Sequence, residues 1–83
     1  MHELSLALEV CRMARDRLPG DNPVRVVSVG VEVGRSAGIE VANFRFCLES
    51  LLQEPPFTGA RTDLVELDGG DLRLAYIEVD DGR

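Results

Sequence analysis

The sequence lacks lysine and tryptophan, and its 83 residues include only two cysteines and four aromatic residues. All nine basic residues are therefore arginines, and the 15 acidic residues outnumber them, giving a formal net charge of −6. An acidic chain repels phosphate groups, which disfavours nucleic acid and anionic membrane surfaces as partners. A divalent cation or a basic protein is the better electrostatic match.

Long apolar runs and paired cysteines are also missing. No stretch approaches the roughly 18 apolar residues of a membrane span, and the N-terminus does not resemble a signal peptide, so we expect a cytoplasmic protein. Cys11 and Cys47 are far apart, and neither belongs to a C-x-x-C pair. Because a closed zinc site needs three or four ligands at paired spacings, we expect no structural zinc and two buried thiols.

The 45% of hydrophobic residues suffices for one thin, two-layer domain over residues 1–83. Apolar residues recur every three or four positions across residues 4–18, which predicts an amphipathic helix. Its predicted inward residues are Leu4, Leu8, Cys11, Ala14 and Leu18, with Leu6, Val10 and Met13 widening the stripe. A second helix is predicted from residue 39 or 40 to residue 53, before Pro55-Pro56.

Three strands complete the predicted fold. Valines at every second position from 27 to 33 predict a strand over residues 24–33, and two more strands are expected at residues 61–67 and 72–79. The intervening Asp68-Gly69-Gly70-Asp71 predicts a tight hairpin. The order α-β-α-β-β predicts an α/β (α+β) fold with two helices packed on one face of a three-stranded mixed sheet.

The N-terminus offers metal donors, because the only histidine of the chain is His2. The Met1 amine, the His2 imidazole and the deprotonated amides of His2 and Glu3 could place four nitrogens in one plane, which suits Ni(II) or Cu(II). Glu3 and Ser5 could instead supply oxygens to a six-coordinate ion. A frayed, solvated terminus is the competing interpretation, although a helix that begins at once would hold the terminus near the fold.

Catalysis has little support in the sequence. Nucleophilic catalysis needs a Ser or Cys beside an oriented base, and the only histidine is terminal. The glycine-containing loop at residues 34–38 is not a P-loop, because no Gly-Lys-Ser/Thr follows it. We therefore expect that the chain is not an enzyme.

The first six residues, Met-His-Glu-Leu-Ser-Leu, lead directly into the first helix, and this opening resembles the HypA/HybF family of hydrogenase nickel metallochaperones. The likeness continues in order along nearly the whole chain. Similar segments are residues 29–34 (first strand), 36–40 (turn into the second helix), 44–46 (second helix), 59–60 and 64–66 (next strand), and 70–79 (closing strand).

The resemblance implies a carrier that delivers Ni(II) during maturation of a nickel enzyme, foremost NiFe-hydrogenase, with urease as a second possibility. It implies His2 as the principal nickel ligand, with the Met1 amine and Glu3 completing the site. Glu40 is a weaker candidate, whose alternative role is a carboxylate that favours the start of the second helix. A HypB-type GTPase and the hydrogenase large subunit are the implied partners.

One departure from the family is large. The family carries a zinc domain with two C-x-x-C pairs between its last two strands, where this chain has only residues 68–71. This opens an alternative function, a zinc-less, metal-independent adaptor module of the hydrogenase maturation machinery. Arg12 and Arg15, with Asp16 and Arg17 close by, would then form a charged helix face for a protein partner. The chelating terminus argues against it, because an adaptor has no need of one.

Overall fold

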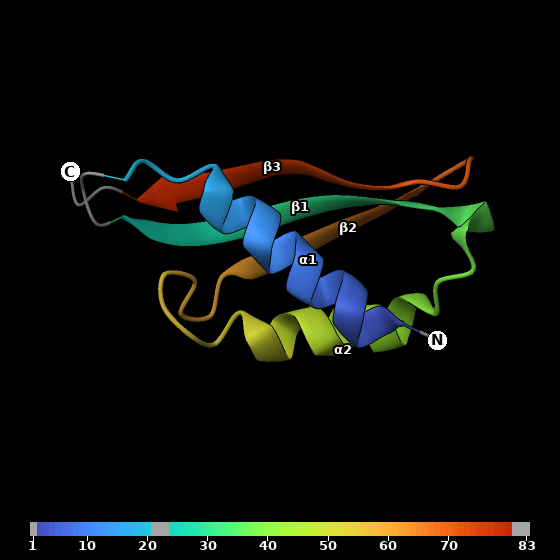
Figure 1. The fold of residues 1–83 in the computed structure, drawn as a ribbon, viewed down its shortest axis with the longest axis horizontal. Helices are drawn as coiled ribbons and strands as arrows, with labels where there is room; N and C mark the ends of the chain where they lie inside the picture. Colours follow the sequence, from blue (N-terminus) through green and yellow to red (C-terminus); the bar gives the residue numbers. More distant parts are fainter. Residues whose placement is uncertain (1, 21–23, 81–83) are drawn as a thin grey trace.

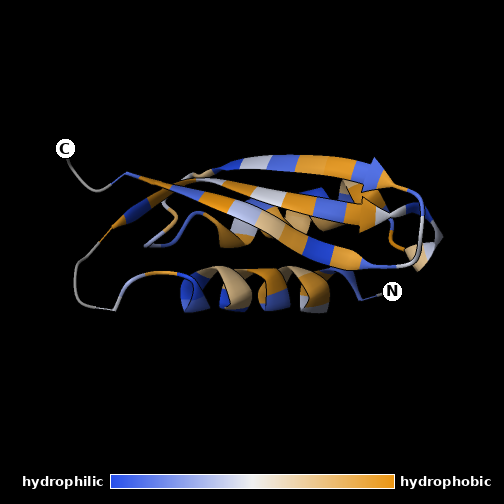
Figure 2. Cartoon of the chain, turned by 90° about the horizontal axis from the view of Figure 1, so that it is seen from above, coloured by the Kyte–Doolittle hydropathy of each residue, from blue (hydrophilic) through white to orange (hydrophobic). Residues whose placement is uncertain are grey.

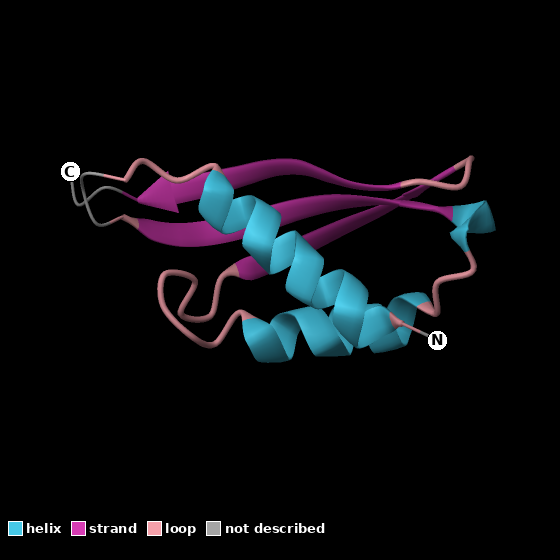
Figure 3. Cartoon of the chain, in the orientation of Figure 1, coloured by secondary structure: helices cyan, strands magenta, loops and turns pink. Residues whose placement is uncertain are grey.

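The computed structural model describes residues 2–20 and 24–80. The elements in chain order are α1 (Glu3–Asp16), β1 (Arg25–Gly34), the short 3-10 helix η1 (Arg35–Ala37), α2 (Val41–Leu51), β2 (Arg61–Leu67) and β3 (Leu72–Asp80). Both α-helices lie on one side of a twisted sheet (Figures 1 and 3). The predicted α-β-α-β-β order and the α+β fold are confirmed.

The sheet has the strand order β2-β1-β3, with β1 in the centre. β1 runs parallel to β2 and antiparallel to β3. The mixed sheet is as expected, but the predicted hairpin at residues 68–71 is wrong, because β2 and β3 are not neighbours. β1 is the most apolar strand and is buried along most of its length, so it takes the central position, where both edges and the helix-facing side are covered.

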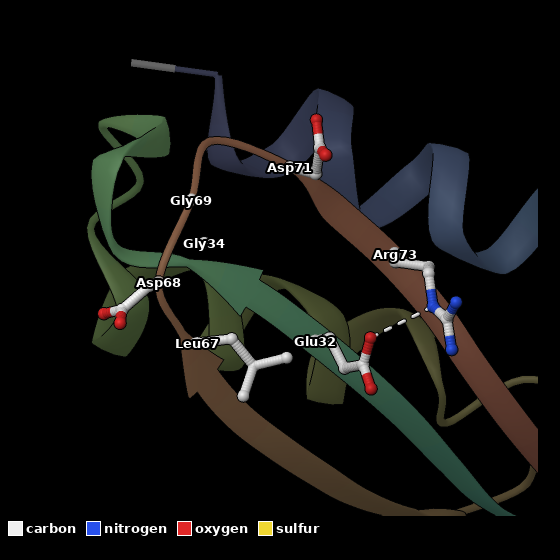
Figure 4. Close-up of a pocket in the computed structure, with 7 residues that line it drawn as sticks. All are labelled: Glu32, Gly34, Leu67, Asp68, Gly69, Asp71 and Arg73. Atoms are coloured by element: carbon white, nitrogen blue, oxygen red, sulfur yellow. Dashed lines mark ion pairs between the residues drawn. The ribbon is translucent and has the colours of Figure 1, made fainter.

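The segment 68–71 instead crosses over the end of β1. The Gly34 N–H donates to the Asp71 carbonyl at 2.7 Å, and the Ser36 N–H donates to the Gly69 carbonyl at 2.9 Å. Gly69 has a φ of 113°, a conformation that favours glycine. In Figure 4 the loop passes Gly69 close to Gly34. A Cβ on Gly34 would lie 2.7 Å from the Asp71 nitrogen, so only glycine fits beneath the crossing.

The core lies between the sheet and the helices, and α1 enters it through only part of the predicted stripe, including Cys11 and Ala14. Ala7, Val10 and Ala14 are fully buried, whereas Leu4 and Leu8 are 55% and 51% exposed. The prediction that these two leucines face inward was therefore wrong. α1 packs on both α2 and β3, and the small alanines let it lie close to them, which turns the leucines outward.

Two further details of the core differ from the expectation. A register shift between Val26 and Ser28 puts Val26 in the core and leaves Val27 half-buried. Cys11 is buried as predicted, but Cys47 is only partly buried. Figure 2 shows the hydrophobic and hydrophilic residues alternating along the strands above the helical layer.

Candidate metal centre at the first turn of α1

His2 stands immediately before α1 and its side chain is exposed. Its carbonyl accepts the first helical hydrogen bond, from the Leu6 N–H at 2.9 Å. The backbone at residue 2 is thus already tied to the helix, while the imidazole faces solvent. Met1, which we predicted to supply the terminal amine, lies outside the described residues.

Glu3 is the first residue of α1, and its side chain is turned inward with only 3% of its surface exposed. Oε2 accepts from the Glu40 N–H at 3.0 Å, and Oε1 accepts from Nδ2 of Asn43 at 3.3 Å. The pKa of Glu3 is lowered, chiefly by the Glu40 N–H; burial opposes this, and the Glu3 amide and Asn43 add to it. The carboxylate therefore joins the start of α1 to the start of α2. The ribbon in Figure 1 shows these two helix starts at the same end of the molecule.

Glu40 is the N-cap residue of α2 and is exposed. Its carboxylate accepts from the Ala42 N–H at 3.3 Å and from the Asn43 N–H at 3.0 Å. These bonds satisfy two amide groups that have no partner within the helix. The structure thus gives Glu40 the helix-starting role that was the alternative to metal binding.

The backbone amides at the start of α1 are potential metal donors beside His2. Among residues 2–20 and 24–80, no three His, Cys, Asp or Glu side chains gather where they could hold a metal ion. Backbone nitrogens are a second kind of donor that a metal at His2 could use beside the imidazole. The first amides of a helix have no carbonyl partner within it, and those of His2 and Glu3 are at the right end of α1. This arrangement suits the planar nitrogen site better than one using the Glu3 carboxylate.

Asn43 is the residue that sequence analysis missed. It lies 40 positions from Glu3 in the chain and is an ordinary polar residue of α2's exposed surface. No local pattern distinguishes it from other surface residues, since its partner is defined only by the packing of α1 on α2. The N-cap position of Glu40, three residues earlier, was the one available hint.

A separate hollow of about 160 Å³ lies at the crossing over β1. Its lining residues are Glu32, Gly34, Leu67, Asp68, Gly69, Asp71 and Arg73 (Figure 4). Arg73 pairs with Glu32 at 3.0 Å, and Asp68 pairs with Arg35 at 3.0 Å. These two ion pairs balance four of the charges at the hollow, and Asp71 adds one further carboxylate to its lining.

A family model described as "Hydrogenase/urease nickel incorporation, metallochaperone, hypA" matches residues 1–73. The chain belongs to the HypA family. The proteins named hydrogenase maturation factor HypA from Azotobacter chroococcum mcd 1 and Azotobacter vinelandii are each 35% identical over 69 residues, covering 83% of this chain and 61% of the relative. That of Albidiferax ferrireducens is 32% identical over 78 residues, covering 94% of this chain and 69% of the relative.

Membership of the HypA family confirms the resemblance seen in the sequence. It also places the chain in a family described as metallochaperones for nickel incorporation into hydrogenase and urease. The chain spans about 61% of the length of the two Azotobacter relatives. No helix in the described part of the chain is long and apolar enough to cross a membrane.

Proposed function

We propose that this HypA-family chain binds Ni(II) at its N-terminus and delivers it to a nickel enzyme during assembly, foremost NiFe-hydrogenase. The observation that carries the proposal is the position of His2, which is exposed directly before a helix whose first residue, Glu3, is anchored in the fold. A mobile tail would lose conformational freedom on binding a metal, whereas a terminus held at a helix start loses less.

The nickel ligands in this proposal are the Met1 amine, the His2 imidazole and the backbone amide nitrogens of His2 and Glu3. Four nitrogens in a plane suit Ni(II). Glu3 thus contributes through its backbone, while its carboxylate stays within the fold. Release of the Ni(II) ion needs only ligand exchange with a recipient protein. As pH falls, protons compete with the metal for the donor nitrogens, so binding weakens.

The partners follow from the family and the charge. A HypB-type GTPase and the hydrogenase large subunit are the partners we propose, and urease maturation is a second route for the same cargo. The relatives are themselves named hydrogenase maturation factors. A net charge of −6 favours both a divalent cation and a basic partner surface. We propose no resident zinc for this chain.

Calorimetric titration of the untagged protein with Ni(II) tests the proposal. His2→Ala should abolish most nickel uptake and leave the circular dichroism spectrum unchanged, because the His2 side chain is outside the core. A retained N-terminal tag should weaken binding by blocking the Met1 amine, whereas a C-terminal tag should not. Equal nickel uptake by wild type and His2→Ala would contradict nickel carriage and leave the metal-independent adaptor.

A further inference from the structure

We propose that Asn43 is a positioning residue for the nickel terminus, acting through the buried Glu3 carboxylate. The Glu3 clamp consists of that carboxylate, the Glu40 backbone N–H and the Asn43 carboxamide. Its role is to hold the first turn of α1 against α2, so that His2 presents its donors in one orientation. This inference rests on the proposed nickel site and assigns a task to groups that do not touch the metal.

The carboxylate of Glu3 is committed to the fold. Each oxygen accepts a hydrogen bond from α2 or its N-cap residue, at 3.0 Å from the Glu40 N–H and at 3.3 Å from Asn43 Nδ2. The side chain is 3% exposed. To bind a metal, the carboxylate would have to leave both donors and turn toward solvent, and losing two hydrogen bonds to an ionised group is unfavourable.

The clamp acts on the residues that would bind nickel because they are adjacent to it in the chain. Glu3 supplies one amide of the proposed site, and consecutive Cα atoms are only about 3.8 Å apart. The helix fixes the other side of the same peptide, since the His2 carbonyl accepts from the Leu6 N–H. Holding the Glu3 side chain therefore restricts the amides of residues 2 and 3 before any metal arrives, which favours binding through pre-organisation.

Asn43 can be altered without changing the proposed donor set. Its side chain contributes one arm of the clamp, while its backbone N–H bonds separately to the Glu40 carboxylate. Asn43→Ala thus removes the carboxamide and leaves the cap of α2 in place. Gln53→Ala is the matched control, because Gln53 also has an exposed carboxamide near α2, and that group donates to the nearby Glu49 carbonyl at 3.1 Å.

Glu3→Gln separates the clamp from direct ligation. Glutamine keeps an oxygen for the Glu40 N–H, and its amide group can donate to Asn43 once the Asn43 carboxamide rotates to present its oxygen. A carboxylate ligand would be lost in the same variant. Glu3→Ala removes both possibilities and measures the whole contribution of the side chain.

The experiment measures the Ni(II) dissociation constant by calorimetry and the visible absorption band of bound Ni(II), whose position reports the donor set. If Asn43→Ala leaves the terminus in its binding geometry in about a tenth to a fifth of molecules, the apparent Kd rises about five- to tenfold. The band should not move, because the donors are unchanged. Glu3→Gln should retain most of the affinity, and Glu3→Ala should lose at least as much as Asn43→Ala.

Amide hydrogen exchange of the metal-free protein gives a readout that does not depend on nickel. Protection of the Glu40 amide should fall in Glu3→Ala and persist in Glu3→Gln. A Glu3→Gln variant that shifts the absorption band and binds as weakly as Glu3→Ala would make the carboxylate a ligand and overturn the clamp. Asn43→Ala binding like Gln53→Ala would also overturn it. Unchanged uptake by His2→Ala would instead refute the nickel site itself, whatever exchange shows.

Discussion

Gly34→Ala is expected to lower the free energy of unfolding by about 2–4 kcal/mol, because the segment joining β2 to β3 lies directly over Gly34. A Cβ there would stand 2.7 Å from the Asp71 nitrogen and 2.8 Å from the Gly69 carbonyl carbon. These are backbone atoms, so no side-chain rotation can relieve the overlap. Forcing a methyl group into packed structure costs about 1–3 kcal/mol.

The remaining part of the effect comes from two hydrogen bonds. If the crossing segment moves away, the bonds from the Gly34 N–H to Asp71 and from the Ser36 N–H to Gly69 lengthen or break. A hydrogen bond of this kind contributes about 1 kcal/mol, so the partial loss of the two bonds adds about 1 kcal/mol in total. For a domain of this size, 1 kcal/mol corresponds to roughly 4–8 °C in melting temperature. Thermal and urea unfolding of the variant should therefore show a large loss of stability.

Gly30→Ala is the matched control on the same strand. There the new methyl group would meet the ring of Tyr76, a side chain that is 40% exposed and would have to rotate outward. Rotation breaks the hydrogen bond from the Tyr76 hydroxyl to Asp63, while alanine favours the strand over glycine by about 0.5–1 kcal/mol. The net change should stay within about 1 kcal/mol. If Gly34→Ala is no more destabilising than Gly30→Ala, the crossing over β1 is refuted.

Two other predictions concern titrating groups. Burial raises the pKa of the Cys11 thiol. A thiol reagent should therefore label the partly exposed Cys47 first and reach Cys11 only on unfolding. Equal labelling rates for the two cysteines in the native protein would contradict the packing of α1. Hydrogen bonds from Arg61 and Tyr76 lower the pKa of Asp63. The ionised Asp63 carboxylate therefore stabilises the folded protein fully above its unfolded pKa of about 3.9, and this contribution is lost as pH falls through the lower pKa of the folded state. The difference in melting temperature between wild type and Asp63→Asn should therefore shrink below about pH 4, and a constant difference would show that Asp63 is not stabilised in the fold.

The local elements were predictable because their signals are local. Predicted helix 4–18 corresponds to Glu3–Asp16, and predicted strand 61–67 has the observed bounds Arg61–Leu67. Hydrophobic periodicity sets the type of element, and glycine and proline set where it ends. His2 could be singled out for the same kind of reason, since a lone histidine at the second position is visible without any structure.

Only the tertiary structure decided how these elements meet. Residues 68–71 have the composition of a hairpin turn, yet the burial of β1 places that strand between its two neighbours and makes the segment a crossing. Leu8 has helical spacing but faces solvent, because the rotation of α1 depends on what it packs against. The bond between Glu3 and Asn43 joins residues 40 positions apart. Composition and spacing determined the elements and the candidate ligand, whereas strand order, helix rotation and the partner of Glu3 depend on contacts between distant residues, which no local pattern encodes.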